Sequence, residues 1–137
     1  LWVRLLRLGL ERPLVTAVTI LTSIDQDVFN NEVGIPGSLQ DRATAWALLA
    51  KEAGLDGVVA SPKEIAAIRS ACGPGFVIIT PGVRPAGSAA NDQKRTMTPG
   101  EAIRLGATYL VVGRPVTAAP DPVKAVQDIL KEIKEIH

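Results

Sequence analysis

The chain has 137 residues, and 47% of them are hydrophobic, which is typical of one folded domain and argues against a disordered segment. Its 15 basic and 14 acidic side chains leave a net charge of +1, so no general attraction to nucleic acid or to a membrane surface is expected. The single cysteine, Cys72, excludes an internal disulfide and fits a reducing, cytoplasmic compartment. With one histidine, His137, a His/Cys metal site or a Ser-His triad is not expected.

The first twelve residues differ in character from those that follow. Leu1–Leu10 mixes leucines and a tryptophan with Arg4 and Arg7, and the chain does not begin with Met. We interpret residues 1–12 as an atypical N-terminal segment, either the remnant of an upstream helix or the translation of a misread frame. An amphipathic targeting segment is the alternative that we favour less.

The next stretch predicts a strand followed by a helix. Leu14–Leu21 is short and rich in β-branched residues, a composition that favours a strand. Ser38, with Asp41 three positions later, resembles a capping box and predicts the start of a helix. That helix is expected to run to about Ala53 and to stop at Gly54, because glycine is the usual residue just after a helix.

Two further units repeat this pattern. Gly57–Ala60 predicts a buried strand, and Ser61–Glu64 supplies an N-cap serine, a proline at the first helical position and a closing glutamate. Phe76–Thr80 predicts a third strand. A loop over residues 81–97 follows it, and Thr98–Glu101 predicts the capping box of the next helix.

The fourth unit completes the series. Tyr109–Val112 predicts a strand, residues 113–120 a loop, and Asp121 with Pro122 the first residues of a last helix that runs to about Ile136. The strands are continuously apolar, which is typical of a parallel sheet buried on both faces. The predicted fold class is therefore α/β, with four parallel β/α units over residues 13–137 that make half of a (β/α)8 TIM barrel.

Half of a barrel has consequences for the isolated chain. A complete barrel needs about 250 residues, and an isolated half leaves two open sheet edges and much exposed apolar surface. We therefore expect the 137-residue chain to be unstable, to aggregate, or to dimerise as a false barrel. A cooperative melt of a monomer would contradict this expectation.

Two strand ends carry residues suited to a phosphate site. Thr80–Pro85 (TPGVRP) and Val111–Pro115 (VVGRP) each follow an apolar run and supply backbone N–H groups and an arginine. In a β/α barrel the sites lie after the carboxyl ends of the strands, and arginine binds phosphate oxygens in bidentate fashion. The long loop over residues 81–97 turns polar around Gln93, which predicts a lid over a charged ligand. We favour this phosphate site over two turns with solvated arginines.

These residues also resemble a known family. The stretch from Thr80 to Thr117, together with Ala17–Ser23 (AVTILTS) and Gly54–Ser61 (GLDGVVAS), is similar to the C-terminal part of bacterial orotidine 5′-phosphate decarboxylases. The resemblance covers about residues 12–130, and it implies the C-terminal half of a TIM barrel.

The resemblance implies an activity and a set of binding residues. Members of the family convert orotidine 5′-monophosphate (OMP) to UMP and CO2 in de novo pyrimidine biosynthesis. They use no cofactor and no metal, and they work as homodimers without a nucleic acid or membrane partner. The resemblance implies that Thr22 lies by the pyrimidine and ribose and that Pro81 lines the pocket beside the base. It also implies that four residues bind the 5′-phosphate: Arg84, Gln93, Gly113 and Arg114.

The catalytic residues of the family do not occur in this sequence. The family uses a lysine after its second strand and an Asp-x-Lys-x-x-Asp motif after its third. The only Asp-x-Lys here, Asp92-Gln93-Lys94, has Met97 where the motif has its last aspartate. We therefore expect no catalytic residue in this chain, and we expect those residues upstream of Leu1, the chain being a fragment.

Three hypotheses about function stay open at this point. The chain is the C-terminal half of an OMP decarboxylase, or a catalytically inactive half-barrel that binds a nucleotide or phosphate, or part of another phosphate-handling barrel enzyme. The loop that carries Gln93 and the strand before Thr22 argue against the third hypothesis.

Overall fold

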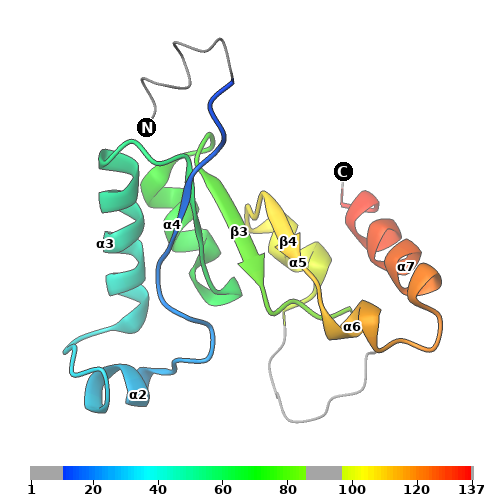
Figure 1. Ribbon diagram of the computed structural model, residues 1–137, viewed down its shortest axis with the longest axis horizontal. Helices are drawn as coiled ribbons and strands as arrows, with labels where there is room; N and C mark the ends of the chain where they lie inside the picture. Colours follow the sequence, from blue (N-terminus) through cyan, green and yellow to red (C-terminus); the bar gives the residue numbers. More distant parts are fainter. Residues whose placement is uncertain (1–10, 86–96, 137) are drawn as a thin grey trace.

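The computed structural model describes residues 11–85 and 97–136. In this part of the chain four parallel strands form one sheet in the order β1-β2-β3-β4, so each strand pairs with the next along the sequence (Figure 1). This arrangement confirms the predicted α/β class with four parallel units. The strands are β1 (Thr16–Val18), β2 (Gly57–Val59), β3 (Val77–Pro81) and β4 (Tyr109–Val111).

Helices follow every strand, and those after β1, β2 and β3 lead to the next strand. None of those described is long and apolar enough to cross a membrane. After β1 come α2 (Gln26–Asn31) and α3 (Leu39–Glu52), and after β2 come the 3-10 helix η1 (Pro62–Glu64) and α4 (Ile65–Cys72). After β3 comes α5 (Pro99–Arg104), and after β4 come α6 (Arg114–Thr117) and α7 (Pro122–Lys134).

The predicted helix starts are confirmed by their caps. The Ser38 hydroxyl accepts a hydrogen bond from the Asp41 N–H at 3.2 Å. Thr98 and Glu101 form a reciprocal capping box, with bonds of 3.2 and 2.9 Å. Asp121 accepts from the Lys124 N–H at 2.9 Å. Local sequence therefore fixes where these helices begin, because each cap satisfies a backbone donor that the first turn leaves unpaired.

One face of the sheet packs on the helices and holds the core. Val58 of β2 and Ile78 of β3 are fully buried among Ile65 and Ile68 of α4 and Ala102 of α5. Cys72 is also buried in this cluster. A smaller cluster of Ile20, Phe29 and Ala43 joins the end of β1 to α2 and α3.

The opposite face of the sheet is open in the described part of the chain. Its side chains include Val18, Tyr109 and Val111, which are 57%, 55% and 53% exposed. The prediction that the sheet is buried on both faces is therefore wrong for these residues, since the helices cover one face alone. The apolar sequence of these strands fits a closed barrel, in which both faces of the sheet are buried, and four strands do not close a barrel.

Two short helices were not predicted. No helix is predicted between Leu21 and Ser38, whereas Asp25 caps α2 by accepting from the Val28 N–H at 2.9 Å, and Asp27 lies in its first turn. Helix α6 lies within the predicted loop over residues 113–120, and the Gly113 carbonyl accepts its first bonds. Helices of six and four residues hold too few apolar positions for a period of 3.6 to be visible.

Candidate functional site

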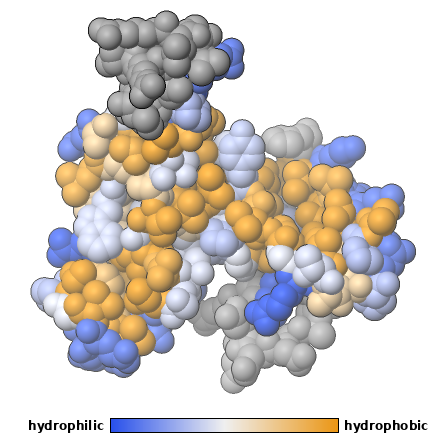
Figure 2. Space-filling view, viewed as in Figure 1, coloured by the Kyte–Doolittle hydropathy of each residue, from blue (hydrophilic) through white to orange (hydrophobic). Residues whose placement is uncertain are grey.

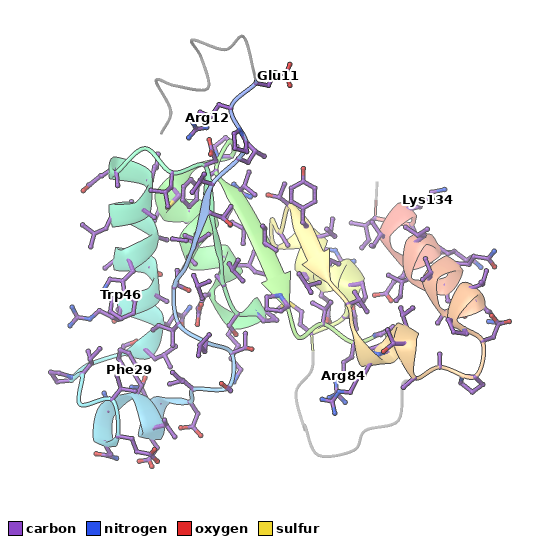
Figure 3. The ribbon with its side chains drawn as sticks, in the orientation of Figure 1. Glu11, Arg12, Phe29, Trp46, Arg84 and Lys134 are labelled. Carbon is purple, nitrogen blue, oxygen red and sulfur yellow. The ribbon has the colours of Figure 1, made fainter. Side chains whose placement is uncertain are left out.

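The predicted site residues follow the carboxyl ends of the strands. Because the four strands are parallel, these ends lie at one edge of the sheet. Thr22 comes four residues after β1, Pro81 ends β3, and Gly113 and Arg114 come directly after the last strand. Figure 3 shows the labelled Arg84 side chain at this edge, pointing away from the strands. The fold therefore gathers these predicted residues at one edge.

The loop after β3 is fixed at its base. Gly82 has φ +78°, a left-handed conformation that favours glycine, and Val83 is 2% exposed in the core. The Arg84 N–H donates a hydrogen bond of 3.1 Å to the carbonyl of Met97, so the two ends of the loop lie together. Gln93 lies outside the described residues, and its predicted role is untested.

The loop after β4 exposes the backbone of Gly113 and the positively charged side chain of Arg114. At Gly113 no atom of the described residues lies within 4 Å of the place that a Cβ would occupy, so the described part of the chain leaves that side of the backbone open. Arg114, the first residue of α6, is exposed. Among residues 11–85 and 97–136, the guanidinium groups of Arg84 and Arg114 make no hydrogen bond or ion pair. These cations have the donors that an anionic ligand needs.

Two buried polar side chains lie at the same edge, and their burial was not predicted. Glu64 is 2% exposed, and its carboxylate accepts from the Ser61 N–H at 3.1 Å. Burial raises the pKa of Glu64, while hydrogen bonds from Ser61 and from the Thr19 hydroxyl oppose that rise. The Thr80 hydroxyl is fully buried and has no hydrogen-bond partner within residues 11–85 and 97–136. The capping-box pattern marked Glu64 as a helix-start residue but carried no sign that it is buried.

The site offers donors for an anion. In the part of the chain that the structure describes, no group of three or more His, Cys, Asp or Glu side chains is placed to hold a metal ion. The groups presented at the edge are arginine side chains, glycine backbone and the Thr22 hydroxyl. Such a set binds phosphate oxygens through charge-assisted hydrogen bonds.

The fold is that of half a parallel β/α barrel, and solved barrels are similar to it. The crystal structure of orotidine 5′-phosphate decarboxylase from Lactobacillus acidophilus matches with a TM-score of 0.75 and 38% identity over 91% of this chain and 51% of that one. The corresponding structure from Pyrococcus horikoshii OT3 matches with a TM-score of 0.54 and 28% identity, over 70% of this chain and 43% of that one.

Sequence comparison is more specific. A family model described as "Orotidine 5'-phosphate decarboxylase / HUMPS family" matches residues 5–129, and the chain belongs to this family. It is 62% identical over 124 residues to the orotidine 5′-phosphate decarboxylase of Moorella thermoacetica, covering 90% of this chain and 49% of that protein. It is 57% identical over 125 residues to that of Geobacter sulfurreducens, covering 91% and 52%. The chain thus spans about half the length of these curated relatives, and it matches their C-terminal half.

Proposed function

We propose that this chain serves in the decarboxylation of OMP to UMP and CO2 by binding the 5′-phosphate of the nucleotide. One observation carries the proposal. Arg84 and Arg114 have side chains without a hydrogen-bond or ion-pair partner among the described residues, and they follow two neighbouring strands at the edge where barrels bind their ligands. The chain that holds them is 62% identical to a protein named orotidine 5′-phosphate decarboxylase.

The register of the sheet supports a shared ligand for the two arginines. Pro81 of β3 pairs with Val111 of β4. Arg84 lies three residues after Pro81, and Arg114 lies three residues after Val111, so both loops leave the sheet at one level. Parallel neighbours are about 4.8 Å apart, a spacing at which two such loops can contact one phosphate group.

The remaining roles are part of the same proposal. The Thr22 hydroxyl contacts the pyrimidine and ribose, Pro81 lines the pocket beside the base, and Gln93 and the Gly113 backbone join the two arginines on the phosphate. The ligands are OMP and UMP, and, as the resemblance implies, the working enzyme is a cytoplasmic homodimer.

The phosphate lies far from the bond that breaks, yet binding it can aid catalysis. Binding energy from a remote part of a substrate can be used to orient the reacting end and to exclude water from it. The sequence holds no Asp-x-Lys-x-x-Asp motif, so the groups that act on the carboxylate and on C6 are not among these 137 residues. We therefore assign the phosphate-binding part of the reaction to this chain.

An inactive nucleotide-binding half-barrel is the second candidate function. The missing motif favours it, because the phosphate-binding residues are present without the residues that act on the carboxylate. The two functions predict the same affinity for UMP and differ in turnover.

A chimera separates them. Residues 13–136 replace the matching half of the Moorella thermoacetica relative, and release of CO2 from carboxyl-labelled OMP is measured. We expect turnover within about tenfold of the parent, since the phosphate-binding loops are supplied intact. A folded chimera that binds UMP but releases no CO2 would favour the inactive binding module.

The arginines are tested in the same chimera. Arg114→Ala should lower kcat/KM about 100-fold, with part of the loss in kcat. The matched control is Arg104→Ala, on the exposed surface of α5, which should change neither constant. A rise in KM alone would show that phosphate binding at this site does not assist the chemical step.

A further inference from the structure

A buried glutamate follows β2 at the edge of the sheet where the candidate site lies. Glu64 ends the short helix η1 and is 2% exposed. Its carboxylate accepts a hydrogen bond of 3.1 Å from the N–H of Ser61, two residues after β2. It also accepts from the hydroxyl of Thr19, the residue directly after β1. One carboxylate therefore bonds to the segments that leave two neighbouring strands.

A helix cap alone does not require this burial. Glu101 closes another capping box of the chain, accepts from the Thr98 N–H at 2.9 Å, and is exposed. Glu64 instead loses contact with water, and burial of a carboxylate costs free energy and raises its pKa. Within residues 11–85 and 97–136 no cation forms an ion pair with Glu64, although the exposed Lys63 is its neighbour in sequence. The burial of Glu64 thus exceeds what the cap needs.

Thr19 is held by the neighbouring strand as well as by Glu64. Its N–H donates to the Val59 carbonyl at 3.1 Å, and its hydroxyl lies 3.2 Å from the same oxygen. Val18 lies on the open face, where hydrophobic side chains gather over the strands (Figure 2). Thr19, the next residue, is 8% exposed and points to the side that the helices cover. Glu64 therefore contacts Thr19 from the helical layer.

The predicted nucleotide contact comes shortly after this anchor in the chain. Thr22 lies three residues after Thr19. It is at the corner of a turn closed by a 2.9 Å hydrogen bond from the Ile24 N–H to the Leu21 carbonyl. The turn leads directly to Asp25, whose carboxylate caps α2. A segment this short, held at both ends, moves Thr22 when Thr19 moves, and a displacement of about 1 Å in a substrate-positioning group can cost about 100-fold in rate.

We propose that Glu64 is a positioning residue for the nucleotide, because its buried carboxyl holds the ends of β1 and β2 where Thr22 can contact the pyrimidine and ribose. The inference rests on the proposed function, in which Thr22 has that contact. Glu64 itself does not touch the ligand, since it lies on the side of the sheet that the helices cover. It acts through Thr19 and Ser61, and a change at Glu64 reaches the reaction by displacing Thr22.

The first experiment removes the carboxyl in the chimera that carries residues 13–136. Glu64→Ala should lower kcat/KM for OMP by about tenfold, with part of the loss in kcat. Glu64→Gln keeps an oxygen that accepts from the Ser61 N–H and an amide that can bond to the Thr19 hydroxyl, so it should restore both constants to within about twofold of the parent. Glu101→Ala is the matched control, because it removes an exposed capping-box glutamate and should change neither constant.

A second variant tests the same contact without emptying the buried site. Thr19→Val keeps the branched shape of the side chain and removes the hydroxyl that bonds to Glu64. It should lower kcat/KM by a similar factor, with circular dichroism measured alongside to show that the fold is intact. The test therefore does not depend on whether the Glu64→Ala chimera folds.

A double-mutant cycle separates positioning from general support of the fold. Thr22→Val removes the proposed contact itself, so adding Glu64→Ala to it should cause little further loss of kcat/KM. Arg114→Ala acts at the phosphate, so adding Glu64→Ala to it should multiply the two losses, to about 1,000-fold in total. A glutamate that only supports the fold would multiply the losses in both cycles.

Two results overturn the inference. Losses that multiply in both cycles show that Glu64 does not act through Thr22. A Glu64→Ala chimera with a lower Tm and unchanged kcat and KM shows that the glutamate supports the fold alone. The proposed function has its own failure: if Thr22→Val and Arg114→Ala both leave the constants unchanged, that function is wrong and the inference fails with it.

Discussion

The sheet has one edge formed by the amino ends of its strands and one formed by their carboxyl ends, and the polar side chains at these two places have different partners. At the amino ends of the strands, side chains bond to neighbouring segments: Asp56 accepts from the Arg12 guanidinium at 2.6 Å and from the Val15 N–H at 2.7 Å. At the carboxyl ends, the Arg84 and Arg114 side chains have no such partner among the described residues. The same residue type thus serves structure at one edge and is available for a ligand at the other.

Arg69 illustrates the amino-end edge. Its guanidinium lies at the end of α4 and donates to the loop before β3 and to the loop before β4, which ties the two strands together. The acceptors are the carbonyls of Gly73, Pro74, Phe76 and Gly106 and the hydroxyl of Thr108, at 2.6–3.2 Å. In a β/α barrel this edge supports stability and the opposite edge carries ligand-binding loops, and that division is already visible in four units.

The largest effect on stability is expected when Arg69, the arginine at the amino-end edge, is removed. Arg69→Ala should lower the free energy of unfolding by about 2–4 kcal/mol, because several charge-assisted bonds are lost and their carbonyls lose a donor. Chemical denaturation monitored by circular dichroism measures it. The control, Arg104→Ala, should change stability by less than about 0.5 kcal/mol. Equal effects of the two variants would show that Arg69 is not a structural tie.

The carboxyl-end arginine should behave in the opposite way. Arg114→Ala should leave the free energy of unfolding within about 0.5 kcal/mol of the parent, because the Arg114 side chain bonds to none of the described residues. Its affinity for UMP should fall by about tenfold or more, the loss of one charge-assisted contact. Titration calorimetry with UMP, and with uridine as the ligand that lacks the phosphate, measures the difference. A variant that unfolds more easily would contradict the proposed division between the edges.

The Asp56 carboxylate, at the amino-end edge, should make the stability of the chain depend on pH. Hydrogen bonds from Arg12 and from the Val15 N–H lower the pKa of Asp56 below its ordinary value of 3.8. The stability that its charge supplies is therefore present above pH 3.8 and is lost as the pH falls through the folded-state pKa. Asp56→Asn should lower Tm at pH 7, and the difference from the parent should shrink toward pH 3. A constant difference at all pH values would argue against a charged contact.

The Glu64 carboxylate should show the reverse slope. Burial raises the pKa of Glu64 above its ordinary value of 4.5. Its contribution is therefore complete below pH 4.5 and declines as the pH rises through the folded-state pKa. Glu64→Gln removes that decline, so at pH 7 the variant should be at least as stable as the parent. Thermal melts of both proteins from pH 4 to pH 8 measure the two slopes, and a variant that melts lower at pH 7 would refute the assignment.

The smallest effect is expected at Thr80, whose buried hydroxyl has no partner. Thr80→Val keeps the shape of the side chain and removes the unsatisfied group, so the free energy of unfolding should rise by about 1 kcal/mol. The exposed Thr117→Val, which changes no buried group, is the control. A loss of stability at position 80 would indicate that the hydroxyl has a partner in solution.

Sequence patterns predicted the parts of the fold that rest on local rules. Ser38, Thr98 and Asp121 cap their helices as expected, because a cap depends on residues three positions apart. The parallel strands were predicted from their apolar runs. The exposure of Tyr109 was not predicted, because a sheet buried on both faces was expected and burial of the open face depends on strands that the described sheet does not contain.

The sequence predicted where the candidate site residues lie relative to the strands, but it did not predict which polar side chains around them are buried. The TPGVRP and VVGRP motifs placed Arg84 and Arg114 after neighbouring strands, and the structure places them there. The burial of Glu64 and the partnerless hydroxyl of Thr80 depend on three-dimensional packing, which no local pattern encodes. The role of Arg69 was missed for the same reason, because its bonds to Gly106 and Thr108 span 37 and 39 residues.

The pairing of β2 with β3 has a consequence for how the chain opens. Gly57 lies opposite Val77, and a Cβ at Gly57 would clash with the Val77 carbonyl oxygen, so these two strands are in close contact. Their linking helix α4 supplies the fully buried Ile65 and Ile68. Amide protons of this central β2–α4–β3 unit should be the last to exchange with solvent, while those of β1 and β4 exchange earlier through local fraying. The centre of the sheet should therefore stay folded while its outer strands open.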